Sequence, residues 1–144
     1  MKQEDKELLL RDLCARLPYG VYGNYLNSDG SLSDDELLRR VKIGYRDLIC
    51  ADGRSGMVLD GFLKPYLFPL SSMTEEQLYN NPIGFSQMLT IKADRDWENI
   101  TINRRAYYKL VDWFNKNHFD YRGLIPMGLA IDATGLNIYK EGTK

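Results

Sequence analysis

The chain has 144 residues, a one-domain length that can bury an ordinary core without disulfides or metals. Hydrophobic residues make up 44% and charged residues 27% of the sequence, which excludes wholesale disorder. With 19 basic and 20 acidic side chains, the formal net charge is −1, and the chain lacks the strongly basic balance typical of nucleic-acid-binding proteins. We therefore expect a single domain over residues 1–144, with nucleic acid disfavoured as a partner.

The two cysteines and the N-terminal residues further limit the class of protein to which the chain can belong. Cys14 and Cys50 are far apart, each beside apolar neighbours, and no CxxC or Cys/His ligand spacing occurs. This pattern predicts buried, reduced thiols and neither a zinc nor a dithiol site. The first 13 residues are too charged for a signal peptide, and no apolar run approaches the ~18 residues of a membrane span. We expect a cytoplasmic protein with no cofactor, no metal and no membrane contact.

The first predicted element is a helix over residues 4–16. Its apolar stripe, at a spacing of four residues, consists of Leu9, Leu13 and Leu17. Pro18 ends the helix because the residue before a proline is pushed out of helical geometry. The stretch 19–27 is short and rich in aromatic and branched residues, and therefore predicts a strand.

The next part of the chain gives conflicting signals. Ser33 and Glu36 match a capping box that would start a short helix, whereas alternation after residue 40 has the two-residue period of a strand. We predict a strand over 40–50, leave 31–39 open between helix and loop, and expect a further strand that begins at 57–59. Because the connections are too short for parallel crossovers, these strands should form an antiparallel meander.

The segment 64–70 contains two prolines, each of which fixes its own φ and lacks a backbone donor. We therefore expect an edge strand or a wall, and not a central strand. Its aromatic side chains either form a stiff ridge for a partner at residues 66–72 or cover the open end of the core. The ridge hypothesis assigns binding to Tyr66, Phe68, Ser71 and Ser72.

A short helix is predicted next. Thr74 and Gln77 form a capping box at its start, and the Asn-Asn-Pro sequence at 80–82 stops it. Residues 82–99 read as irregular, with one strand around 88–92.

The strongest helix signal follows Asn103, the predicted N-cap, and ends near Asn117. Its apolar face consists of Tyr107, Leu110, Val111 and Phe114. Residues 124–133 then read as a compact loop or short strand that folds back. We expect folding to depend most on Leu13, Leu17, Leu110, Trp113 and Phe114.

The only histidine, His118, directly follows this helix, with Asp120, Tyr121 and Arg122 close behind. One interpretation is a small-ligand or hydrolytic site in which His118 and Asp120 form an orienting pair and Arg122 clamps an anion. However, no serine or cysteine marks itself as a nucleophile. The alternative is structural, with His118 as a dipole-compensating helix cap and 120–123 as a turn with an internal ion pair. We assign no catalytic residue.

The remaining charged groups have simple explanations. Glu75 and Glu76 suit the first turn of a helix, and the acids at 94, 96 and 98 lack the pattern of a calcium loop. The one basic group is formed by Arg39, Arg40 and Lys42. It directly follows the acids at 34–36, so we expect mutual charge compensation. Nucleic-acid binding through the basic group is a weaker hypothesis.

Three phrases of the sequence resemble a known group. DLCARLPYGV (12–21), KPYLFPLSSMTEEQ (64–77) and DWFNKNHFDYRGLIPMGLA (112–130) are similar to a family of small proteins encoded by gut anaerobes and their prophages. The resemblance implies no site and no substrate. It implies an accessory protein of a mobile element in preference to a housekeeping enzyme.

Together these features predict an α+β domain, with a small antiparallel sheet of three to four strands covered by an N-terminal helix and a longer C-terminal helix. The leading functional hypothesis is a non-enzymatic module that binds another protein through the ridge at 66–72 and the adjoining turn at 118–122. The alternative is the small-ligand or hydrolytic site built on His118, Asp120 and Arg122. The oligomeric state is left open.

Overall fold

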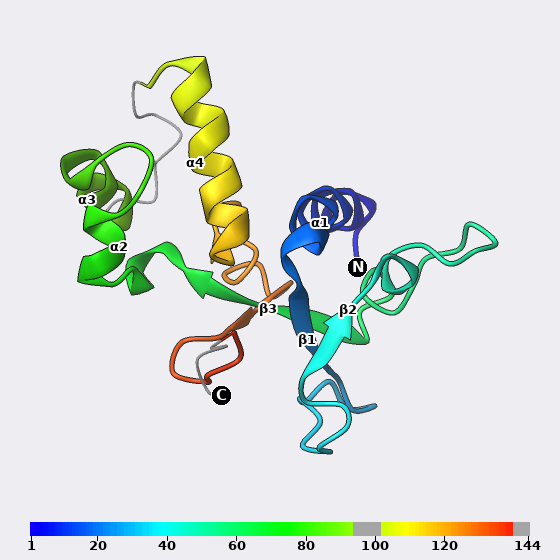
Figure 1. Cartoon of the computed structure of the whole chain (residues 1–144). Coiled ribbons are helices and arrows are strands. Elements are labelled where there is room, and N and C mark those ends of the chain that lie inside the picture. Colours follow the sequence, from blue (N-terminus) through cyan, green and yellow to red (C-terminus); the bar gives the residue numbers. More distant parts are fainter. Residues whose placement is uncertain (94–101, 140–144) are drawn as a thin grey trace.

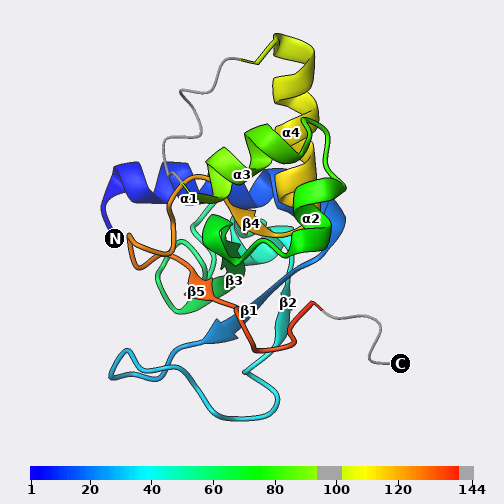
Figure 2. The same ribbon diagram turned by 90° about the vertical axis from the view of Figure 1, so that its left-hand side faces the viewer.

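A computed structural model describes residues 1–93 and 102–139 of the chain and confirms the α+β class (Figure 1). Its helices are α1 (Gln3–Arg16), α2 (Glu75–Tyr79), α3 (Phe85–Ala93) and α4 (Arg104–Lys116). Its strands are β1 (Val21–Tyr25), β2 (Val41–Ile43), β3 (Leu63–Pro69), β4 (Phe119–Asp120) and β5 (Ile131–Asp132). Short 3-10 turns occupy Leu17–Tyr19, Tyr45–Asp47 and Leu70–Ser72. In both views α1 and α4 lie above the sheet, and the loop between β1 and β2 extends from its other end (Figures 1 and 2).

The sheet is mixed, with the order β2-β1-β3-β4, and β5 also pairs with β3. β1 and β2 are antiparallel neighbours, as expected, but β1 also pairs with β3, so the predicted meander order is wrong. Residues 57–59 form a turn that buries Val58 and Leu59, and not a strand. The long excursion between β2 and β3 carries the chain past β1 to its other edge. β4 and β5 add parallel pairs on β3.

β3 is central, contrary to the expectation from its prolines. β1 pairs with residues 63–65, whereas β5 and β4 pair with residues 66–69. Because the neighbours use different halves of the strand, the missing donors of Pro65 and Pro69 interrupt no continuous two-sided ladder. β1 approaches closely through Gly23, where a Cβ atom would lie 2.6 Å from the Lys64 carbonyl oxygen.

The helices follow their local signals except in one place. At α2, Thr74 Oγ1 accepts from Gln77 N at 3.2 Å and Gln77 Oε1 accepts from Thr74 N at 2.9 Å, which confirms the capping box. At α4, Asn103 Oδ1 accepts from Ala106 N at 2.8 Å. The strand expected at 88–92 is wrong, because these residues belong to α3.

Three further expectations concern the first half of the chain. Residues 31–39 are irregular and contain turns, because the Ser33 hydroxyl accepts from Asp35 N and starts no helix. The strand predicted over 40–50 is limited to β2, since the chain turns into a 3-10 helix after Gly44. The thiols are not buried as expected: Cys14 is exposed, Cys50 is partly exposed, and both are free.

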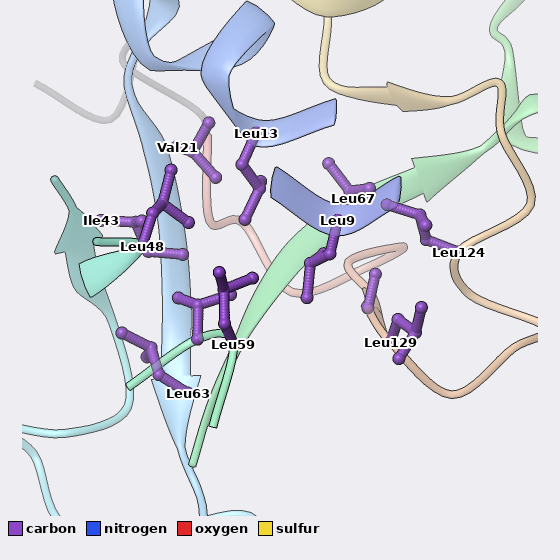
Figure 3. Close-up of a cluster of buried hydrophobic side chains, with 12 residues drawn as sticks. Leu9, Leu13, Val21, Ile43, Leu48, Leu59, Leu63, Leu67, Leu124 and Leu129 are labelled. Carbon is purple, nitrogen blue, oxygen red and sulfur yellow. The ribbon is translucent and has the colours of Figure 1, made fainter. Parts of the chain in front are cut away.

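In the part of the chain that the structure describes, the core consists of three apolar clusters. Figure 3 shows the largest, in which Leu9 and Leu13 of α1 lie among side chains of β1, β3 and the 124–130 loop. The second lies beneath α4 and contains Met73, Leu78, Met88, Ile91, Leu110, Phe114, Phe119 and Tyr121. The third surrounds Tyr66. Leu13, Leu110 and Phe114 are fully buried as expected, whereas Leu17 and Trp113 are only partly buried at the margins.

Candidate functional site

A fully buried ion pair joins α1 to the segment after α4. Arg16 Nε donates to Asp12 Oδ2 at 2.7 Å, and Arg16 Nη2 donates to Asp12 Oδ1 at 3.1 Å. The same Nη2 donates to the Phe119 carbonyl oxygen at 2.6 Å. Both side chains have 0% exposure. A buried charge without a partner is costly, so this pair fixes the position of β4 relative to α1.

Arg122 extends this cluster from the turn after β4. Its Nε lies 3.2 Å from Asp12 Oδ1, and the ring of Tyr121 lies 5.1 Å from the guanidinium carbons of both Arg16 and Arg122. The internal ion pair expected between Asp120 and Arg122 is therefore wrong, because Arg122 pairs with Asp12.

Asp120 is occupied by the backbone of its own turn. Its Oδ1 accepts from Leu124 N and its Oδ2 accepts from Ile125 N, both at 2.8 Å. The side chain is buried, and this burial raises the pKa of the carboxyl group, opposed by those two hydrogen bonds. The arrangement holds the turn closed.

His118 occupies the left-handed position just past α4, with φ of 63°. Its backbone N donates to the Asn115 carbonyl oxygen at 3.2 Å, and its imidazole stacks on Tyr139 with centroids 3.6 Å apart. Burial lowers the pKa of the imidazole to about 4, with the nearby Arg16 charge acting in the same direction. His118 is therefore neutral at pH 7, and the expected dipole-compensating charge is wrong.

The predicted ridge is largely interior. Tyr66 is only 5% exposed, and its hydroxyl lies 2.9 Å from Asn24 Oδ1 and 3.1 Å from the Arg39 carbonyl oxygen. Phe68 is half-buried against Phe119 and Tyr139. An exposed aromatic ridge is thus wrong for Tyr66, which covers the core as the alternative predicted.

The last residues of that segment are closer to solvent. The Ser72 hydroxyl donates to the Pro69 carbonyl oxygen at 2.7 Å, whereas Ser71 is exposed. Ser71, Asp120 and Tyr121 line one pocket of about 540 Å³, beside the end of α3.

The described pockets do not bring the other predicted site residues together. Arg122 lines a pocket of about 420 Å³ between α1 and α4, together with Tyr121. His118 lines a third pocket, of about 270 Å³, with Arg40 and Lys42. His118, Asp120 and Arg122 therefore face three different cavities.

Sequence reasoning missed Asp12 and Arg16. The available signal was their position, since each follows a stripe leucine (Leu9 and Leu13) by three residues and so shares the buried face of α1. An acid and a base four residues apart on an apolar face indicate a buried pair.

The expectations of no metal site and no membrane span concern, in this structure, residues 1–93 and 102–139. In these ranges no group of three or more His, Cys, Asp or Glu side chains is placed to hold a metal ion. Within the same ranges, each helix is too short or too polar to cross a membrane. The acids at 94, 96 and 98 lie outside the described residues.

The fold and the site define a small α+β protein with a structural charge cluster at its centre and pockets at its margins. Comparison of the chain with protein-family models, curated proteins and solved structures gave no match.

Proposed function

We propose that the protein is a non-enzymatic binding module that engages another protein through a groove beside α3. This α3 groove is the 540 Å³ pocket, and its lining includes Leu70, Ser71, Ile91, Tyr121, Ile125 and Pro126. A mostly apolar concavity with a few polar groups is the usual form of a site that accepts a side chain of a partner.

Strand pairing supports this location. The parallel pairing of β3 with β4 sets Phe68 beside Phe119 and Pro69 beside Asp120. The two segments predicted to bind a partner, 66–72 and 118–122, therefore adjoin as expected, and both line the α3 groove, through Ser71 of the first and through Asp120 and Tyr121 of the second.

The observation that carries the proposal is an exposed apolar stripe on α3 that leads to this groove. Phe85 and Leu89 are 37% and 45% exposed and, with Ala93, recur at a spacing of four residues on one helix face. Tyr79 is 62% exposed and stacks on Phe85 with centroids 4.6 Å apart. Ala93 lines the groove itself. Aromatic and aliphatic anchors beside a pocket are typical of protein interaction surfaces.

The same geometry favours binding over hydrolysis. General acid–base work by His118, Asp120 and Arg122 would require the three groups around one substrate, whereas they line separate cavities. The resemblance of three sequence segments to proteins of gut anaerobes and their prophages supports an accessory role in a mobile element.

Site-specific photo-crosslinking in the producing cell tests the proposal. A photoreactive phenylalanine analogue at Leu89 should capture one protein partner. The matched control is the same analogue at Leu37, which is 85% exposed in the loop between β1 and β2. Tyr66 and Tyr121 are unsuitable positions because both are buried.

The partner captured at Leu89 should be absent at Leu37 and should be lost when Phe85→Ala is added. Identical products at both positions, or no product at Leu89, would contradict the proposal.

A further inference from the structure

A second concavity lies on another part of the molecule, where the end of α4 meets β1 and β2. This basic pocket has a volume of about 270 Å³, and its lining includes Tyr19, Tyr22, Arg40, Lys42, His118 and Tyr139. It joins the only histidine to two members of the basic group, 76 and 78 positions away in the chain.

Within residues 1–93 and 102–139, no carboxylate forms an ion pair with either cation of the basic pocket. The described ion pairs join Arg16 and Arg122 to Asp12, and Arg54 to Asp52. The acids at 34–36, all of which the structure describes, form no direct ion pair with Arg40 or Lys42. Asp112 is a carboxylate bonded to the pocket lining, since it accepts from the Tyr19 hydroxyl.

Arg40 is held in position by a carbonyl oxygen and an aromatic ring. Its Nε donates to the Ile138 carbonyl oxygen at 3.0 Å, and its guanidinium carbon lies 4.0 Å from the centroid of the Tyr22 ring. Among the residues that the structure describes, these contacts leave the terminal nitrogens of the guanidinium for another acceptor. A fixed cation loses little entropy when it binds an anion, and a guanidinium can donate two parallel hydrogen bonds to phosphate.

The inner end of the pocket is aromatic and uncharged. His118 stacks on Tyr139, and the Tyr139 hydroxyl accepts from Tyr22 N at 3.0 Å and donates to the Tyr66 carbonyl oxygen at 2.7 Å. His118 Nδ1 is buried and has no hydrogen-bond partner among the described residues. A neutral imidazole can donate or accept one hydrogen bond, so this end is polar without repelling an anion.

The geometry points to a small phosphate-bearing ligand in the basic pocket, with Arg40 and Lys42 contacting the phosphate and the tyrosine rings packing on the remainder. A phosphate monoester carries about −1.5 to −2 charges at pH 7, which matches the two cations of this pocket better than a carboxylate does. The volume suits a small molecule and not a duplex, and the inference is independent of the α3 groove.

The chain offers a built-in reporter for this inference. Because His118 is the only histidine, its imidazole signals in a ¹H–¹⁵N NMR correlation spectrum need no assignment in the untagged protein. Inorganic phosphate and phenyl phosphate are titrated separately at constant ionic strength, with chloride as the compensating anion. These two arms distinguish free phosphate from a phosphate ester.

We expect saturable displacement of the His118 signals. Arg40→Gln and Lys42→Gln should each weaken binding by about tenfold or more, because each removes a charge-assisted hydrogen bond. Arg105→Gln, an exposed charge on α4, is the matched control and should stay within about twofold of the parent protein. Circular dichroism melting verifies that each variant is folded.

Absence of saturable displacement in both arms would overturn the inference, as would equal affinities in the parent protein and both pocket variants. A single-stranded oligonucleotide that displaces the same signals at far lower concentration than phenyl phosphate would also overturn it, in favour of nucleic acid.

Discussion

His118 and Tyr139 stack ring on ring, with centroids 3.6 Å apart and planes inclined by 13°. The contact joins His118, just past α4, to the C-terminal segment. Tyr139 in turn forms hydrogen bonds with β1 and β3 through its hydroxyl group. Burial in this position keeps the imidazole neutral and lowers its pKa to about 4.

Acidification should therefore weaken the fold through His118. The unfolded chain binds a proton near pH 6.5, whereas the folded chain does so near pH 4, so the free energy of unfolding falls as pH decreases between these values. The total loss should approach about 3 kcal/mol. Chemical denaturation at several pH values measures it.

His118→Asn is the control, since asparagine tolerates the left-handed backbone and does not titrate. The raised pKa of Asp120 acts in the opposite direction and is common to both proteins. An equal pH slope in the two proteins would show that the imidazole is not held neutral.

Phe114→Ala should lower the free energy of unfolding by about 3–5 kcal/mol, because the Phe114 ring is fully buried and packs against Phe119 and Tyr121. Tyr108→Ala on the same helix is the matched control, since Tyr108 is 66% exposed, and should change stability by about 0.5 kcal/mol or less. Urea denaturation measures both. Comparable midpoints for the two variants would place Phe114 outside the core.

Gly23→Ala should destabilise the sheet by about 1–3 kcal/mol or more, because the new methyl group would lie 2.6 Å from the Lys64 carbonyl oxygen. Gly44→Ala provides the comparison, since its Cβ atom would meet nothing closer than 3.9 Å. Thermal unfolding followed by circular dichroism should separate the two variants by several degrees. Equal melting temperatures for the Gly23→Ala and Gly44→Ala variants would show that β1 and β3 are not as close as described.

Local sequence signals are sufficient to predict most of the helices but insufficient to predict the order of the strands in the sheet. The caps at Thr74 and Asn103 are encoded within a few residues, so both helix starts are predictable. α3 was missed because its nine residues carry no capping box, and the burial of Met88 and Ile91 in the second apolar cluster stabilises it. The order of the strands depends on long-range packing that no local pattern states.

The candidate sites also include one part that local sequence signals predict and one part that depends on long-range packing. The burial of Asp12 and Arg16 can be read from the helical period, whereas the approach of Arg40 to His118 depends on how β2 and α4 pack in three dimensions. The single histidine drew attention to the correct segment. Its partners, however, are not its sequence neighbours.

A double-mutant cycle on Asp12 and Arg16 tests most directly whether the polar cluster after α4 is structural. Asp12→Leu should cost about 3–5 kcal/mol, since it leaves Arg16 buried without its counter-charge. Adding Arg16→Met should recover most of that loss, giving a large coupling energy. Additive effects, or an Asp12→Leu variant within about 0.5 kcal/mol of the parent protein, would contradict a structural role for the cluster.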